Sequence, residues 1–164
     1  MAVSLIQSLY QPFGSGVLVP GTGIVLNNRA ACFAVSGRVV PGRRPYHTLI
    51  PGLLLDSEGR LVGPFGVMGG FIQAQAHAQF VLAAVEEELD PQAALDRPRF
   101  RIDRATVHLE PGLWPAAATL KLQGLTAMRS ADVTSFGGGQ AIFVRDGILL
   151  GGSDARKDGY AGAV

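Results

Sequence analysis

The chain has 164 residues, the length of one ordinary domain, and 48% of them are hydrophobic while 16% are charged. This composition provides enough apolar surface for a compact core and excludes a disordered chain. The 14 Lys and Arg residues against 13 Asp and Glu leave a net charge of +1. We therefore expect neither the basic surface of a nucleic-acid-binding protein nor an acidic tail.

Cysteine and histidine usage argues against a metal centre. Cys32 is the only cysteine, which excludes an intrachain disulfide and a cysteine cluster and is typical of a small buried side chain. His47, His77 and His108 lie far apart without the spacing of a zinc motif. We expect no metal and no cofactor.

Membrane and export signals are not found in the sequence. The N-terminus lacks the basic and apolar regions of a signal peptide, and Gly, Pro or polar residues interrupt each apolar run before membrane-spanning length. We therefore expect a cytoplasmic protein that does not contact a membrane.

Short elements separated by glycine and proline turns are expected along the first part of the chain. The sequence predicts a strand over Ala2–Tyr10, short strands over Val17–Val19 and Ile24–Leu26, a surface loop over Arg29–Arg44, and a hairpin of Leu53–Asp56 with Leu61–Val62. The strands rest on β-forming residues between turn signals, and the loop on its lack of any sustained hydrophobic period.

Helices and strands alternate in the second part. The sequence predicts helices over Phe71–Leu89, Asp90–Asp96 and Pro115–Gln123, strands over Arg99–Ile102 and Thr106–Leu109, a hairpin of Gln140–Val144 with Ile148–Leu150, and a loop-like tail over Gly151–Val164. Asp90 and Pro91 form a helix start, and Asp146-Gly147 is a strong hairpin turn. We expect one α+β domain spanning residues 1–164.

The stretch Pro64–Phe71 holds the most informative local feature. It places Gly69 and Gly70 where an apolar strand gives way to a helix. Glycine lets a ligand approach the backbone, and the first N–H groups of a helix have no partner inside it. Such a turn either binds the negative charge on a reacting carbonyl oxygen or serves as a tight packing turn.

Several longer segments resemble the small subunit of the γ-glutamyltranspeptidase family. They include Pro20–Asn28, Pro41–Pro51, Gly66–Gly70, Leu89–Phe100, Phe136–Ile142 and Gly151–Gly159, in consistent order over nearly the whole chain. The resemblance implies an N-terminal-nucleophile hydrolase with an αββα sandwich, made as a precursor that cuts itself. It also implies amide hydrolysis or acyl transfer, with Gly69 and Gly70 as the oxyanion hole.

The resemblance puts the nucleophile, a threonine freed by that cut, upstream of the segment matched by Ala2–Tyr10. Loss of the attacking residue costs a hydrolase on the order of a million-fold in turnover. We therefore expect this chain to be inactive alone, as an incomplete sandwich that needs a large-subunit-like chain or associates with itself through an open sheet edge at Ala2. The alternative is a non-catalytic remnant that acts as a binding or structural subunit.

Residues expected around the substrate depart from the family pattern. The acidic residues that grip an α-amino group are replaced by Arg29 and its neighbours, including Cys32, and the two serines that grip an α-carboxylate are replaced by His47 and Thr48. We expect Arg29 to contact a substrate carboxylate, with His47 or Thr48 supplying a hydrogen bond, so that the substrate is a small carboxylated amide. The alternative is an Arg29 paired with a loop carboxylate.

Two further positions near the expected nucleophile carry hydroxyl groups. Ser8 matches a family position that usually holds a hydroxyl, and we assign it to the substrate site on that resemblance. Tyr10 departs from the amide usual at its position, and the resemblance gives it no role.

Overall fold

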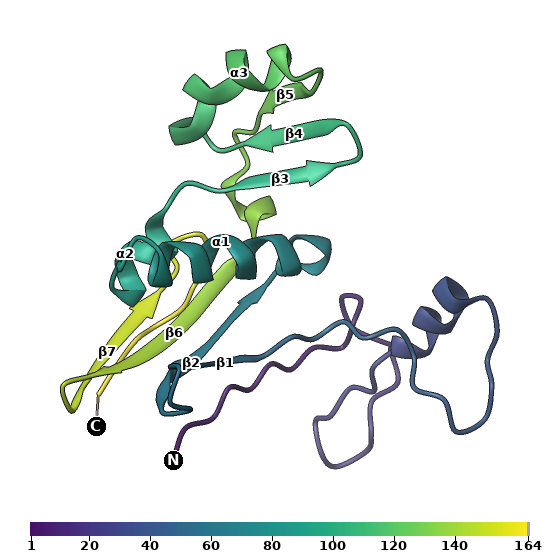
Figure 1. Ribbon diagram of the computed structural model, residues 1–164. Helices are drawn as coiled ribbons and strands as arrows, with labels where there is room; N and C mark the ends of the chain where they lie inside the picture. Colours follow the sequence, from purple (N-terminus) through teal and green to yellow (C-terminus); the bar gives the residue numbers. More distant parts are fainter. Residues whose placement is uncertain (164) are drawn as a thin grey trace. The chain divides into compact units, whose positions relative to one another are not determined.

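The computed structural model describes the backbone of residues 1–163 and their side chains except those of residues 34–36 (Figure 1). The chain divides into two compact units. Unit 1 comprises Met1–Ser4 and the chain from Pro51 onward, and unit 2 comprises Leu5–Ile50. Our expectation of a single domain stays a prediction.

A four-stranded antiparallel sheet forms the centre of unit 1. Its strands, in spatial order, are β1 (Gly52–Leu55), β2 (Leu61–Met68), β6 (Gly138–Arg145) and β7 (Ile148–Ser153). The predicted hairpins β1–β2 and β6–β7 are both confirmed, and Asp146 and Gly147 turn the second one with positive φ angles of 52° and 77°. The central pair β2–β6 joins segments far apart in the sequence.

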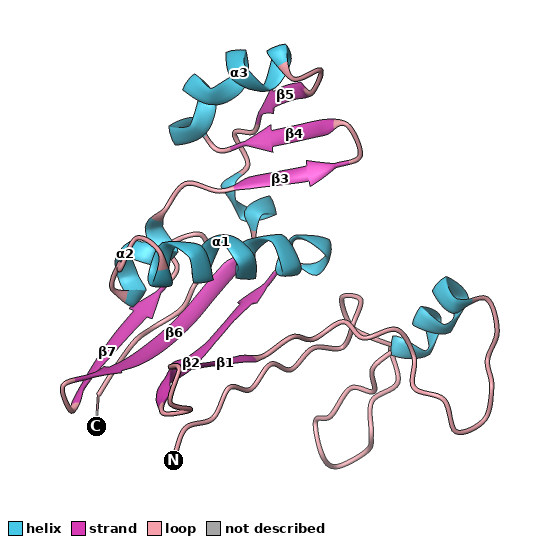
Figure 2. Ribbon diagram, in the orientation of Figure 1, coloured by secondary structure: helices cyan, strands magenta, loops and turns pink. Residues whose placement is uncertain are grey.

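Two helices pack on one face of this sheet (Figure 2). They are α1 (Gln73–Val85) and α2 (Pro91–Asp96), and α2 begins as predicted, with Asp90 accepting a hydrogen bond from the Ala93 N–H at 2.9 Å. Phe80 of α1 packs between the sheet residues Phe65 and Phe143, at ring-centroid distances of 5.2 and 5.9 Å. These rings are the centre of the hydrophobic core.

A second sheet in unit 1 has three strands. They are β3 (Phe100–Asp103), β4 (Thr106–Leu109) and β5 (Thr126–Arg129), with α3 (Ala117–Leu122) following a 3₁₀ helix over Pro111–Ala116. The predicted β3 and β4 are confirmed, and the predicted third helix Pro115–Gln123 is confirmed as α3 over Ala117–Leu122, with its first two residues in the 3₁₀ helix. β5 was not predicted from the sequence, and it pairs parallel to β4.

Two glutamines of α1 pair with the free edge of β3 as another strand would. Gln79 donates to the Phe100 carbonyl at 2.9 Å and accepts from its N–H at 3.0 Å, and Gln75 does the same with Ile102 at 3.0 and 2.7 Å. Residues four apart lie on one helix face, and residues two apart share one strand edge. The glutamines therefore satisfy backbone groups that β4 does not reach and fix the second sheet on α1.

A buried charge network ties the C-terminal segment to both sheets. Asp154 accepts hydrogen bonds from Arg99 at 2.7 Å, from the Gly139 N–H at 3.0 Å, and from Arg156 at 3.0 Å. Arg156 also forms a bidentate pair with Glu110, with both distances at 2.6 Å. The side chains of Arg99 and Asp154 are 2% and 0% exposed, so the segment predicted as a loop-like tail contributes some of the most buried groups of unit 1.

Three sequence predictions need correction. Ala2–Tyr10 forms no strand, because its backbone enters neither sheet; Ser4 instead donates through its hydroxyl to the Phe65 carbonyl at 2.9 Å. The edges of the four-stranded sheet are therefore β1 and β7, and no sheet edge begins at Ala2. The predicted helix Phe71–Leu89 ends at Val85 as α1, because Glu88 has a left-handed φ of 54°.

Unit 2 has little regular structure. The two short strands predicted over Val17–Val19 and Ile24–Leu26 reduce to a single bridge between Leu18 and Val25. The loop predicted over Arg29–Arg44 begins with a 3₁₀ helix, Arg29–Ser36. Within the described chain, no helix combines the length and apolar character that crossing a bilayer requires.

We predict that Asp154→Asn destabilises the protein by about 3–5 kcal/mol, because removing one partner of a buried ion pair leaves the other charge uncompensated. Urea unfolding of the two proteins measures the change. The control is Glu87→Gln, which breaks a surface pair with Arg97 whose side chains are 53% and 42% exposed and costs about 1 kcal/mol or less. Equal effects of the two substitutions would contradict the central role of Asp154.

Candidate functional site

The predicted Gly69–Gly70 turn links β2 to α1 through a short 3₁₀ helix, Gly70–Ile72. Gly69 has φ 139° and Gly70 has φ 68°. A Cβ on Gly69 would lie 2.7 Å from Ile72 Cγ2 and 2.8 Å from the Gly137 Cα, whereas a Cβ on Gly70 would meet nothing within 4 Å. Conformation therefore requires glycine at both positions, and close packing requires it at Gly69 as well.

The amides of this turn are available to a ligand. Among the described residues, neither the Gly69 nor the Gly70 N–H donates a recorded hydrogen bond, and both residues are exposed. The Gly70 carbonyl is instead occupied, because it accepts from Gln73 Nε2 at 2.9 Å. Two adjacent unpaired N–H groups can bind a negatively charged oxygen.

Unit 2 brings three of the predicted substrate-binding residues together. Arg29 Nε donates to Thr48 Oγ1 at 2.8 Å, and Arg29 Nη2 donates to Ser8 Oγ at 2.7 Å and to the Ser8 carbonyl at 3.1 Å. The Nη1 group of Arg29 makes no recorded hydrogen bond within the described chain. Neutral groups thus hold one edge of the guanidinium and leave its positive charge uncompensated.

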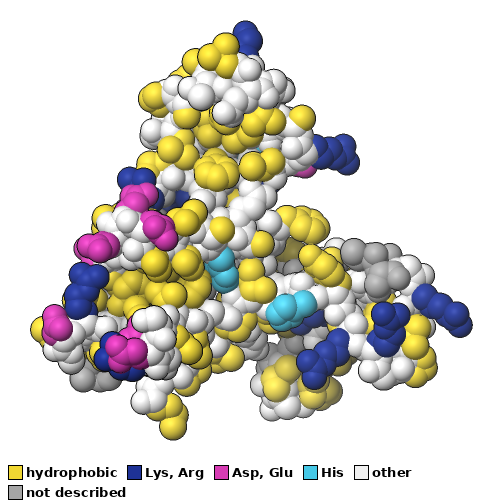
Figure 3. Space-filling view, viewed as in Figure 1, with side chains coloured by type: hydrophobic (Ala, Val, Ile, Leu, Met, Phe, Trp, Pro, Cys, Tyr) yellow, Lys and Arg dark blue, Asp and Glu magenta, His cyan; other side chains and the backbone are white. Residues whose placement is uncertain are grey.

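The charge distribution excludes a carboxylate partner for Arg29 within unit 2. This unit contains Arg29, Arg38, Arg43 and Arg44 and not one Asp or Glu, so all 13 acidic residues of the protein belong to unit 1. Figure 3 shows the basic side chains of unit 2 without acidic ones beside them. The positive potential of the unit favours an anionic ligand.

The remaining predicted residues take less part in this cluster. His47 is exposed and has no recorded hydrogen bond to a described residue. Cys32 is buried, and the hydrogen bond between the Tyr10 hydroxyl and the Cys32 side chain raises the pKa of Tyr10 above its ordinary value. The cluster is thus Arg29, Ser8 and Thr48 in unit 2, and the glycine turn belongs to unit 1.

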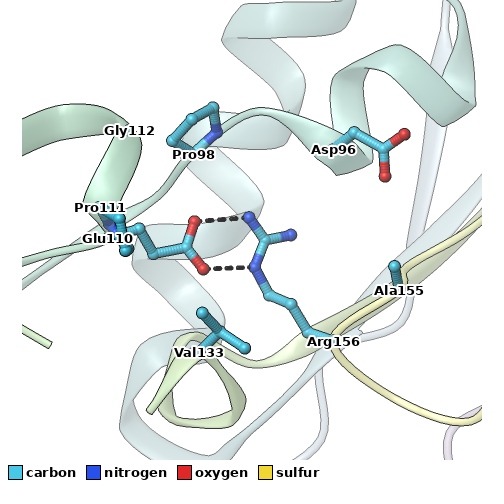
Figure 4. Close-up of a pocket in the computed structure, with 8 residues that line it drawn as sticks. All are labelled: Asp96, Pro98, Glu110, Pro111, Gly112, Val133, Ala155 and Arg156. Atoms are coloured by element: carbon cyan, nitrogen blue, oxygen red, sulfur yellow. Dashed lines mark hydrogen bonds and ion pairs between the residues drawn. The ribbon is translucent and has the colours of Figure 1, made fainter. Parts of the chain in front are cut away.

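A cavity of about 280 Å³ lies elsewhere in unit 1 (Figure 4). It is lined by Asp96, Pro98, Glu110, Pro111, Gly112, Val133, Ala155 and Arg156. The Arg156–Glu110 ion pair crosses it, and all five N–H groups of the Arg156 guanidinium are engaged by Glu110, Asp154 and backbone carbonyls. None of the predicted site residues lines this cavity.

One polar residue beside the glycine turn was not found from the sequence. His77 Nε2 accepts a hydrogen bond from the Val67 N–H at 2.8 Å, two residues before Gly69. Burial, and then the positive charge of Arg99, lower the pKa of His77 below its usual 6.5. The available signal was a histidine on the otherwise uncharged helix Gln73–Val85. Among the described residues, no cluster of His, Cys, Asp or Glu has a geometry that would hold a metal ion.

Comparison with known proteins places these features in a family. The sequence profile of the gamma-glutamyltranspeptidase family matches residues 1–164. The chain is 35% identical to the oxamate amidohydrolase proenzyme of Klebsiella pneumoniae subsp. pneumoniae and 32% identical to the glutathione hydrolase-like YwrD proenzyme of Bacillus subtilis. Each alignment covers 98% of this chain and 33% of the relative, so the chain spans about a third of their length.

Solved structures agree with this assignment. The cephalosporin acylase of Bacillus halodurans superposes with a TM-score of 0.86 at 42% identity, over 94% of this chain and 30% of that one. A gamma-glutamyltranspeptidase chain of Pseudomonas nitroreducens superposes with a TM-score of 0.81 at 25% identity, over 99% of this chain and 92% of that one. The mixed α+β architecture with antiparallel sheets is therefore that of these proteins.

We predict that Gly69→Ala lowers the free energy of unfolding by about 3 kcal/mol, because a side chain adds both backbone strain and overpacking. Gly70→Ala is the matched control, since it adds a left-handed alanine in open space at a cost of about 1 kcal/mol. Urea unfolding measures both. If the two variants are equally stable, the close contact at Gly69 does not constrain the turn.

Proposed function

The chain belongs to the gamma-glutamyltranspeptidase family, and we propose that it supplies the carbonyl-binding turn and the substrate-binding unit of an amidohydrolase. The observation that carries this proposal is the pair of unpaired N–H groups at Gly69 and Gly70, at the end of β2. An anion-binding turn of this kind serves reactions in which a carbonyl oxygen becomes negatively charged. The relatives include an amidohydrolase and a cephalosporin acylase.

The proposed reaction proceeds through a covalent acyl-enzyme. A threonine hydroxyl from outside these 164 residues attacks the amide carbonyl carbon and loses its proton to a base, forming a C–O bond. The N–H groups of Gly69 and Gly70 stabilise the resulting oxyanion. The C–N bond then breaks, the amine leaves with a proton, and water releases the carboxylic acid.

The partner of this chain is proposed from the face of the four-stranded sheet that lies opposite the helices. The helices cover one face only, and the other presents apolar side chains from all four strands: Leu53, Leu55, Met68, Ile142, Val144 and Leu149. We propose that a large-subunit-like part or a second copy of the chain covers this face, which completes an αββα sandwich in the first case.

The substrate class is proposed from Arg29. Its guanidinium has no carboxylate partner within unit 2, and it is oriented by Ser8 and Thr48. A substrate carboxylate would pair with the uncompensated charge, whereas an ammonium group would be repelled. We propose small amides that carry a carboxylate, the chemical class of the oxamate named for the Klebsiella relative.

The proposed reaction is tested with a chimera, in which this chain replaces the matching third of the Klebsiella oxamate amidohydrolase proenzyme. We expect the chimera to cut itself into two chains and to release ammonia from oxamate, while the isolated chain stays at the rate of a blank. A chimera that is cut correctly but leaves every amide intact would favour the alternative, a non-catalytic binding or structural subunit. Turnover by the isolated chain would show that no external nucleophile is needed.

The substrate class is tested by Arg29→Ala in the same chimera. We expect KM for oxamate to rise about tenfold or more, which corresponds to the 1.5–3 kcal/mol of a charge-assisted hydrogen bond. Arg43→Ala removes one positive charge from the same unit and is the control for long-range attraction. If both variants raise KM equally, Arg29 does not contact the carboxylate.

A further inference from the structure

Helix α1 contacts both ends of the Gly69–Gly70 turn through two side chains one helical turn apart. Gln73 Nε2 donates to the Gly70 carbonyl at 2.9 Å, and His77 Nε2 accepts from the Val67 N–H at 2.8 Å. Residues four apart in a helix share a face. One face of α1 therefore holds the backbone on each side of the turn.

The bond from Val67 to His77 exists because β1 is shorter than β2. The β1–β2 pairing ends at Phe65, opposite Gly52, whereas β2 continues beside β6 to Met68. Beyond Phe65, the backbone groups that face the β1 side have no strand partner. Val67 is 1% exposed, so an unpaired N–H there would destabilise the fold, because it would lose its hydrogen bond to water without gaining another. The His77 imidazole accepts the hydrogen bond that a neighbouring strand would otherwise accept from the Val67 N–H.

His77 can play this part only as a neutral ring. A histidine nitrogen that accepts a hydrogen bond carries no proton, so the proton resides on Nδ1. The surroundings favour the same form, since the Phe65 ring lies 5.2 Å from the imidazole and the positive charge of Arg99 acts on it. Arg99 is paired with Asp154 and is the only charged group of the described residues with a recorded influence on His77.

We propose that Gln73 and His77 are positioning residues that hold the Gly69 and Gly70 amides unpaired and ready for an oxyanion. The Gly70 carbonyl accepts from both the backbone N–H and the side-chain amide of Gln73, which fixes the orientation of that peptide group, and His77 holds the strand end that leads into the turn. Groups fixed before the reaction need no reorganisation as charge develops. The role of this arrangement in catalysis rests on the proposed function. The effect of His77 on the conformation of the turn does not depend on it.

The proposal is tested by following backbone amide signals of the isolated chain by NMR as the pH falls. We expect the His77 ring to titrate below pH 6.5 and the amides of Val67, Gly69 and Gly70 to shift with the same midpoint. Because the pKa of His77 is lower in the folded protein, its contribution to stability is complete above pH 6.5 and is lost as the pH falls through the folded value. The Gly59 amide, in the exposed β1–β2 turn, is the internal control and should not follow this midpoint.

Two variants separate the hydrogen bond from the bulk of the side chain. His77→Gln retains an acceptor, so we expect the turn amides to keep their positions while the pH step disappears. His77→Leu fills similar space without an acceptor, and hydrogen exchange at Val67 should accelerate at least tenfold, with the β6–β7 amides unchanged as a measure of intact folding. Titration of His77 without any response at Gly69 and Gly70 would overturn the proposal, as would unchanged turn amides in His77→Leu.

The chimera distinguishes this proposal from the proposed function. His77→Gln should lower kcat less than His77→Leu does, with KM unchanged in both, because the turn acts on the transition state and not on substrate binding. If the chimera is inactive while the amide signals of Gly69 and Gly70 still follow the titration of His77, only the proposed function is refuted. If the chimera is active while those amide signals do not respond to the titration of His77, only the positioning role is refuted.

Discussion

The buried carboxylate of Asp154 is the interaction on which most of unit 1 depends. It binds the Gly139 amide in β6, Arg99 before β3, and Arg156 in its own segment, which in turn pairs with Glu110 after β4. Burying these charges is costly, and the cost is offset because both oxygens of Asp154 and of Glu110 and all five N–H groups of the Arg156 guanidinium have partners. The network therefore joins the two sheets through one buried centre, while Gln75 and Gln79 join them a second time through α1.

Elements that neighbouring residues determine could be predicted from the sequence, whereas those that depend on distant partners could not. The α2 start at Asp90-Pro91 and the β6–β7 turn at Asp146-Gly147 were predicted because neighbouring residues determine them. The burial of Asp154 was not, because its partners Arg99 and Gly139 lie 55 and 15 residues away. A polar, glycine-rich segment is typical of a loop, and nothing within it indicates distant arginines.

The two errors in strand prediction also arise because strand pairing depends on residues far away in the sequence. Ala2–Tyr10 has β-forming residues but pairs with neither sheet, whereas the unremarkable Thr126–Arg129 becomes β5 beside β4. Strand formation depends on a partner, and a single sequence does not name one. The candidate site shows the same limit. The glycine turn and Arg29 were predicted from residue type and resemblance, but the bonds from Arg29 to Ser8 and Thr48, and His77 below the turn, required coordinates.

Helix α1 contacts both the edge of β3 and the glycine turn through its polar side chains. Gln73, Gln75, His77 and Gln79 alternate with apolar or small residues, a pattern that resembles a strand, yet helical geometry sorts them into two pairs four residues apart. One pair meets the edge of β3 and the other meets the glycine turn. All four are neutral when they make these bonds, so the helix satisfies backbone groups of β2, β3 and the glycine turn without placing a charge beside Arg99.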